Sequence, residues 1–515
     1  MNYKSGLKSK ESSHIFQDRT KQIGPEEEED FTDEDMTMEE KNQIIGQALE
    51  NAPIHCQHFN EALVSASTEI KNIMIEITCD VKILKSKIYP ILQTYSILQN
   101  LSSLIVTEGI LETVLSRAMI LIYRIILFVP QTTEFFYNLI PIDFLLQTGF
   151  TIGRYIRKSF LSIHIINKFY TSNIKNFSET FHSLFEHTIQ RVADCQLQVD
   201  NGWVEPDSPP IPPIPYKSCF KNEYHKATLI LIRNLTTRPL PEDDYNSVMS
   251  IIVQYINRQE PNDDYNDDFI SLVFQIIKNM LLTKTLSFDD LESSGLTQKL
   301  LYEFYEGSYV TRLYACDAFS VMVENGWFNG IEIDMILTHI DEDANKDKLT
   351  ASALHLLNTI IEYVPPNILD VVSELTDFSE TNQGFKTIAK CGNGEYPFRV
   401  REEAAKCFIN LMKRANLNQL NVMIIDEENA KITFTALLSF SELEDAELVN
   451  DVLFGILKLF EESEKSGEQR VRDLWYWFSE LNGSDIMEDV QELNKDNMDI
   501  QEKIEKIQTI WEDIC

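Results

Sequence analysis

The chain has 515 residues, of which 43% are hydrophobic, and it carries a formal net charge of −36. A surface this acidic repels the phosphates of nucleic acids, which argues against nucleic-acid binding, and it attracts basic partners. Residues 1–40 hold 12 acidic and 5 basic residues, which leaves −29 on the rest. We therefore expect the acidity to be spread along the body, with solubility alone as the alternative interpretation.

The first 40 residues are expected to form a disordered N-terminal arm. Residues 1–22 are basic, and residues 26–40 carry ten Asp or Glu and no Lys or Arg. Neither half has enough apolar residues to bury a core. The basic residues of the arm are Lys4, Lys8, Lys10, Arg19 and Lys21. An inert solubilising tail is the alternative interpretation of this segment.

From about residue 41 onward, a helix-sized apolar motif returns every forty to fifty residues. Each copy begins with a small residue, continues with Leu, Ile, Val or Phe, and often ends with Asn before another apolar residue. The clear copies are residues 117–125, 227–235, 271–280, 315–322, 353–360 and 404–411, and fainter ones are 159–167, 452–460, 504–510 and a stretch near Ile73. This period is typical of stacked helical repeats. We predict an all-α fold over residues 41–515, an armadillo-repeat solenoid of about ten repeats wound as a right-handed superhelix.

One segment interrupts the helical pattern. Residues 204–215 contain six prolines, which exclude a helix and favour a polyproline-like connector. A stiff spacer that loops out of the stack is the preferred interpretation. A ligand for an aromatic-lined module is the alternative.

The chain offers little for catalysis. Its eight cysteines occur singly without a CxxC pair, which argues against zinc or thioredoxin-like chemistry and favours free thiols in a reducing compartment. His55 and His58 form a close pair, but no acidic residue follows them at metal spacing. Phosphate-loop, nucleophile-elbow and zinc-protease motifs are missing from the sequence. We therefore expect a protein that is not an enzyme and needs no cofactor or metal.

The sequence also favours a protein that does not enter membranes. The N-terminus is polar and charged, unlike a signal peptide. The most apolar stretch, residues 118–130, is too short to span a bilayer and contains Arg124. We expect a monomer, when free, of the cytoplasm and nucleus.

Ten armadillo repeats behind a basic tail resemble importin-α, the family of nuclear import adapters. The segments that carry this resemblance are Arg233-Asn234-Leu235 through Pro241 and on to Ile252, Arg401-Glu402-Glu403-Ala404-Ala405 through Asn410, Leu453 through Glu468, and Asn482 through Ile486 with Gln501 through Trp511. Around Asn2-Tyr3-Lys4 and Asp18-Arg19-Thr20 the arm resembles a worn importin-β-binding tail. The resemblance implies a concave groove for the lysine-rich signals of cargo proteins, with importin-β as a second partner.

The resemblance also implies roles for particular residues. In importin-α, an Asn on each inner helix binds the peptide backbone, because an amide side chain both donates and accepts. Acidic residues nearby pair with the lysines of the signal. The residues that match these positions are Asn234, Asn279, Asn358, Glu403 and Asn410. The plain alternatives are Asn side chains that only bond their own solenoid, and a Glu that is simple surface charge.

The sequence departs from the family at the tryptophans that stack on lysine stems. Their positions hold Ile120, Ile230, Gln275 and Lys406, and Arg124 takes an Asn position. These departures argue against the larger signal site of the second to fourth repeats, and the thin basic tail argues for weak or no binding to importin-β. The leading hypothesis is a divergent importin-α-like adapter. The alternative is an armadillo scaffold that has lost signal binding and joins other protein partners.

Overall fold

The computed structural model describes residues 37–512 with internal gaps. The gaps are residues 153–155, 173, 175–176, 178–180, 183–188, 203–216, 258–265, 342–346, 377–383, 393–394 and 442–444. The five basic residues of the N-terminal arm and the connector at 204–215 therefore lie outside the described residues. The first described helix begins at Met38, where Thr37 and Glu40 form a capping box.

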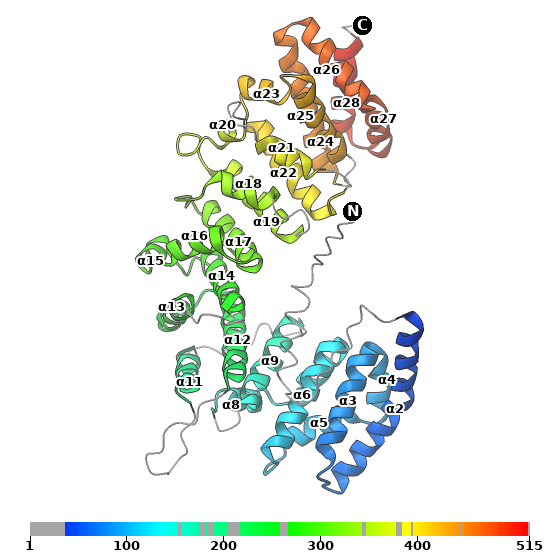
Figure 1. The fold of residues 1–515 in the computed structure, drawn as a ribbon, viewed down its shortest axis with the longest axis vertical. Coiled ribbons are helices and arrows are strands. Elements are labelled where there is room, and N and C mark those ends of the chain that lie inside the picture. The colour runs from blue at the N-terminus through cyan, green and yellow to red at the C-terminus, as the bar shows by residue number, and fades with distance from the viewer. Residues whose placement is uncertain are drawn as a thin grey trace, which may run out of the picture. The chain divides into compact units, whose positions relative to one another are not determined.

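The described residues form helices and no strand. They group into two compact units, Met1–Thr285 and Leu286–Cys515, in which each stack follows the chain from one colour to the next (Figure 1). Unit 1 contains α2 (Met38–Val64), α3 (Ile70–Leu84), η1 (Lys85–Ile88), α4 (Tyr89–Thr94), α5 (Ile97–Ile105), α6 (Glu112–Phe128), η2 (Pro130–Thr132), α7 (Thr133–Leu139), α8 (Ile142–Gly149), α9 (Arg157–Thr171), α11 (Ile189–Asn201), α12 (Ser218–Leu235), α13 (Glu242–Ile256) and α14 (Asn266–Leu282).

Unit 2 is also built of helices. It contains α15 (Phe288–Ser293), α16 (Leu296–Glu306), α17 (Tyr309–Glu324), α18 (Ile333–Asp341), α19 (Asp347–Tyr363), α20 (Val371–Leu375), α21 (Gly384–Lys390), α22 (Phe398–Arg414), α23 (Leu417–Met423), α24 (Glu427–Ser441), α25 (Ala446–Ser466), α26 (Glu468–Glu480), α27 (Gly483–Leu493) and α28 (Met498–Glu512).

Each copy of the sequence motif lies in a helix of its own, which we call a motif helix. The motif helices are α3, α6, α9, α12 and α14 in unit 1, and α17, α19, α22, α25 and α28 in unit 2. Within each unit, every motif helix packs against the next one along the chain. The predicted fold class, an all-α stack of armadillo-like helical repeats, is confirmed. The number of repeats stays a prediction.

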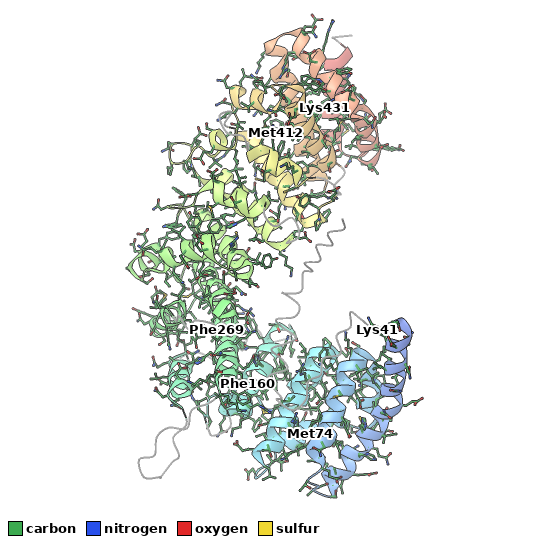
Figure 2. All side chains as sticks on the ribbon, viewed as in Figure 1. Lys41, Met74, Phe160, Phe269, Met412 and Lys431 are labelled. Carbon is green, nitrogen blue, oxygen red and sulfur yellow. The ribbon has the colours of Figure 1, made fainter. Side chains whose placement is uncertain are left out.

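Small residues let neighbouring motif helices approach closely. Ala404 and Ala405 of α22 and Ala353 of α19 are fully buried, and α19 packs on α22. On the next helix, a Cβ added to Gly455 would lie 3.2 Å from Sδ of Met412, the side chain labelled within unit 2 in Figure 2. The Leu, Ile and Phe residues between these small ones fill the core, and each contributes about 1.5–3 kcal/mol when buried.

A second layer of helices covers one side of the motif helices in unit 2. Its members are α16, α18, α21 and α24, which pack on α17, α19, α22 and α25 in turn. Polar residues that recur on the motif helices are therefore found on the side away from this layer.

Replacing Gly392 by Ala tests the packing within the second layer, where the turn after α21 meets α24. A Cβ at this position would lie 2.4 Å from Cε1 of the buried Phe440 ring on α24, so the ring or the turn must move. We expect a loss of about 1–3 kcal/mol in the free energy of unfolding, measured by urea denaturation. The control is Gly46→Ala in α2, where a Cβ meets nothing within 4 Å and a helix interior should gain about 0.5–1 kcal/mol. Equal midpoints for the two variants would contradict this packing.

Candidate protein-binding face

Polar residues on α22 recur at helical spacing on one side of the helix. Glu402 and Glu403 stand four and three positions before Lys406, and Asn410 and Lys413 follow it at steps of four and three. This spacing places all five on one side of the helix. We define the motif-helix face of unit 2 as this stripe together with its neighbours on the adjacent motif helices. The neighbours are His355 of α19 and Asp451 and Phe454 of α25.

Ion pairs and hydrogen bonds connect the motif-helix face from one helix to the next. Nζ of Lys406 lies 2.7 Å from Oε1 of Glu402 and 3.4 Å from Oε1 of Glu403. The other carboxylate oxygen of Glu403 lies 3.2 Å from Nδ1 of His355. Lys413 pairs with Asp451 at 2.7 Å. The chain's own cations thus occupy the carboxylates of this face.

Two pKa shifts follow from this arrangement. Burial raises the pKa of Glu403, but the hydrogen bond from His355 and the charge of Lys406 outweigh it, so the pKa lies below its usual 4.5. The hydrogen bond to Glu403 raises the pKa of His355 above its usual 6.5, burial opposes this rise, and Asp317 and Glu324 of α17 add to it. Glu403 is therefore ionised at neutral pH, and His355 keeps its proton to a higher pH than an ordinary histidine does.

An asparagine pair bridges α19 and α22 beside these charges. Nδ2 of Asn410 donates to Oδ1 of Asn358 at 2.9 Å. Asn358 is buried, whereas Asn410 is half-buried. No donor among the described residues reaches Oδ1 of Asn410. This amide oxygen is available to accept a hydrogen bond from a ligand.

The two sequence-predicted asparagines of unit 1 have a different environment. Asn234 is only 3% exposed; its Nδ2 donates to Oδ1 of Asn167 at 3.1 Å, and its Oδ1 accepts from Arg233 at 3.2 Å. Nδ2 of Asn279 donates to the carbonyl oxygen of Arg233 at 2.9 Å. The structure thus brings Asn358, Glu403 and Asn410 together in unit 2. Asn234 and Asn279 belong to unit 1, where each donates to the preceding motif helix.

Where the resemblance implies tryptophan, most of the side chains present are buried or hydrogen-bonded within the protein. Ile120 is buried, and Gln275 accepts from Arg233 at 3.1 Å while donating to the carbonyl oxygen of Ser271 at 3.1 Å. Arg124 is 7% exposed on α6. Its charge lies near Tyr123, where burial is the main cause that raises the tyrosine's pKa to about 12. In the described part of unit 1, a buried arginine thus stands where the resemblance implies an asparagine.

The division into two units changes the description of charge. Residues 286–515 hold 45 Asp and Glu and 19 Lys and Arg, a net charge of −26, whereas residues 41–285 hold 24 and 21, a net charge of −3. The expectation that acidity is spread along the body is wrong, because nearly all of it outside the arm falls in unit 2. The charged residues can be counted from the sequence, but only the boundary between the two units near residue 285 shows how the charge is divided between them.

Sequence reasoning missed part of this face. His355, Glu402, Lys413, Asp451 and Phe454 were not predicted as site residues. Glu402 has a local signal, since it stands four residues before Lys406 and eight before Asn410 on one stripe. His355 and Asp451 are brought to α22 by packing between repeats, and no local pattern marks them.

Replacing His355 by Gln tests the pair with Glu403. A raised histidine pKa stabilises the fold fully below pH 6.5 and ceases to do so as the pH rises through the folded value; a lowered glutamate pKa stabilises above 4.5 and ceases as the pH falls through the folded value. The wild-type advantage in Tm should be about 1–3 °C near pH 6, as for a partly exposed pair, and shrink toward pH 8.5. A gap independent of pH would show that the pair does not form.

Among the described residues, no single helix combines the length and the apolar composition needed to cross a membrane. The pair Glu112–Phe128 and Pro130–Leu139, bent by 120°, passes a test of length and composition only when taken together.

Comparison with known proteins supports the fold and does not assign a family. No family model and no curated protein match the chain. An engineered protein solved by the Northeast Structural Genomics Consortium is similar with a TM-score of 0.53 and 10% identity, covering 88% of this chain and 98% of its own. This likeness concerns the fold alone.

Two further solved structures are more distant. A chain from a study of the phosphorylation switch between cadherin and beta-catenin has a TM-score of 0.40 and 11% identity, over 91% of this chain and 96% of its own. Kap121p has a TM-score of 0.36 and 13% identity, over 92% of this chain and 53% of its own. The chain therefore spans about half the length of Kap121p.

Proposed function

We propose that this chain is a protein-binding adapter that receives a basic, extended segment of a partner on the motif-helix face of unit 2. The observation that carries the proposal is the cluster of Glu402, Glu403 and Asn410. Two carboxylates on one stripe can each accept from an ammonium group, and the open amide oxygen of Asn410 can accept from a backbone N–H. Lysine side chains and an extended backbone supply these donors.

The spacing of the motif helices suits an extended ligand. Packed helices lie about 8–10 Å apart, and an extended chain rises about 3.3 Å per residue. Every third residue of the ligand therefore meets the next motif helix. If one lysine of the ligand pairs with Glu402 and Glu403, the ligand residues three positions before and after it lie near His355 on α19 or Asp451 on α25.

Electrostatics favours the same partner. A net charge of −26 on unit 2 attracts basic segments and speeds their encounter, and it repels acidic ones. Binding of this kind weakens with salt, because the Debye length falls from about 30 Å at 0.01 M to about 10 Å at 0.1 M.

Titration of the full chain with a fluorescent lysine-rich peptide tests the proposal. Anisotropy at 50 mM salt should show saturable binding that weakens at 300 mM. A peptide of equal length with its lysines replaced by glutamates is the control, and it should not bind. Equal binding of both peptides, or no saturable binding at 50 mM salt, would remove basic-segment recognition.

The finer role that we propose is import of cargo proteins with basic localisation signals, acting between cytoplasm and nucleus. Its support is the resemblance of the segments around Asn234, Asn410 and the C-terminal repeats to importin-α. Glu403 and Asn410 are the proposed first contacts, and Asn358 is a proposed contact through the pair that it forms with Asn410. Asn234 and Asn279 are secondary, because a ligand must first replace the bonds they already make. Failure to bind both a localisation signal and importin-β, whose proposed partner is the basic arm, would remove the import role.

A scaffold that binds other protein partners is the second candidate function. The observation that favours it is the bonding of Asn234 and Asn279 within unit 1, together with Arg124 on the same layer of helices. Replacing Asn410 by Ala separates the two candidates. An adapter should lose affinity for its lysine-rich peptide, whereas a scaffold with another binding surface should retain its partners.

A further inference from the structure

A shallow hollow lies at the C-terminal end of unit 2, where α27 turns into α28 beside the start of α25. Its volume is about 470 Å³, and the two helices that form its turn lie together near the end of the chain (Figure 1). The residues that line it are Ala446, Leu493, Asn494, Asp496, Asn497, Met498 and Asp499. None of them belongs to the motif-helix face.

Two large apolar side chains at this hollow are exposed to solvent. Leu493 is 84% exposed and Met498 is 79% exposed. A single exposed leucine is ordinary on a protein surface, but two large apolar residues at one hollow form a patch that a ligand can cover. Methionine suits such a surface, because its thioether adapts to differently shaped partners.

The turn that carries these side chains is held by hydrogen bonds. Nε2 of Gln501 donates to the carbonyl oxygens of Gln491 and Asn494, both at 3.0 Å. Nδ2 of Asn494 donates to the carbonyl oxygen of Val490 at 2.9 Å. A backbone fixed in this way lowers the cost of ordering the surface on binding.

The charge around the hollow indicates the partner. Asp496 and Asp499 line it, and neither has an ion-pair or hydrogen-bond partner among the described residues. Residues 483–499 hold six Asp and Glu and one lysine, and that lysine, Lys495, pairs with Glu492 at 3.0 Å. The negative charge around the hollow repels acidic segments. It also repels a second copy of this chain, because that copy carries its own acidic unit 2.

We propose that the α27–α28 turn is a second docking surface, which binds a short basic segment of a partner protein that carries an aliphatic side chain. The aliphatic group lies between Leu493 and Met498 and removes both from water. Lysine or arginine residues beside it in the ligand pair with Asp496 and Asp499. The surface is small, so binding through it alone is weak and gains strength when the same partner also occupies another surface.

Methyl NMR of the full chain labelled with ¹³C-methyl methionine tests this proposal. The Met498 signal is assigned from its loss in Met498→Leu, and the buried Met412 signal serves as an internal reference. The ligand is a 12-residue peptide of alternating Lys and Leu, and the matched controls alternate Glu with Leu and Lys with Ser. We expect the Lys–Leu peptide to shift the Met498 signal saturably. The Lys–Ser peptide should need at least about tenfold higher concentration to produce the same shift. The Glu–Leu peptide should leave the Met498 signal unshifted.

Two variants complete the test. Asp496→Asn combined with Asp499→Asn should weaken the Met498 response about tenfold while leaving the Met412 signal in place. Glu402→Gln combined with Glu403→Gln should leave the Met498 response unchanged, so failure of the motif-helix face does not affect this result. The proposal is overturned by an unresponsive Met498 signal, by an equal response to the Glu–Leu peptide, by an unaffected response in the Asp variant, or by a shift that follows protein concentration alone and marks self-association.

Discussion

Replacing Glu402 and Glu403 together by Gln should weaken binding of a lysine-rich peptide by roughly 30- to 1000-fold. Both carboxylates lie within 3.4 Å of the Lys406 ammonium, and an incoming lysine would take its place. Hydrogen bonds to charged groups contribute about 1.5–3 kcal/mol when well formed, and partial exposure reduces this to about 1–2 kcal/mol for each carboxylate. The variant also leaves Lys406 without a counter-charge, which repels the ligand.

The matched control for this variant lies on the other layer of helices. Glu427 and Glu480 both pair with Lys431, each at 2.7 Å. They form a second group of two glutamates around one lysine in unit 2, and Lys431 is labelled in Figure 2. Replacing these two glutamates by Gln removes the same net charge. If the control weakens peptide binding as much as the Glu402 and Glu403 variant, attraction is a property of the whole unit and the motif-helix face is not the binding site.

Replacing Lys406 by Gln should strengthen binding of the same peptide by roughly tenfold. The Lys406 ammonium occupies Glu402 and Glu403, so a ligand lysine has to displace it. One unit charge about 4 Å from the ligand's own charge costs about 1 kcal/mol in water and more near a protein surface. Removing that charge while keeping a polar side chain should lower Kd, mainly at low salt.

Calorimetric titration of the wild type and the Lys406→Gln variant at 50 mM salt measures this gain. Lys465→Gln is the control, because Lys465 pairs with Glu462 at 2.8 Å near the end of α25 and its loss changes the net charge equally. The expected result is a clear gain for the first variant and less than twofold for the second. A loss of affinity in Lys406→Gln would show that Lys406 orders the site and does not compete with the ligand.

The sequence predicted the helices well, because the spacing of apolar residues along each helix marks the side that must be buried. Ala404, Phe408 and Leu411 mark the buried side of α22 whatever its neighbours are. The cap of the first described helix is also local, because Thr37 and Glu40 are three residues apart.

The candidate site could be predicted only in part. Asn410 and Glu403 were found through their local context, but the partner of Glu403 is His355, 48 residues away, and the register between α19 and α22 decides that contact. The same limit applies to Asn234, which the pattern places on a motif helix but which the structure bonds to Asn167. Side chains that meet between repeats depend on packing geometry, and a single sequence does not report it.

Photo-crosslinking from the motif-helix face tests the central claim most directly. Phe454 is exposed on α25 and Tyr476 is exposed on α26, so each can be replaced by the larger p-benzoyl-phenylalanine without filling the core. With a bound lysine-rich peptide, crosslinking should occur from position 454, fall in the Glu402 and Glu403 variant, and be weak from position 476. A peptide that binds saturably but crosslinks from position 476 and not from 454 would contradict the account.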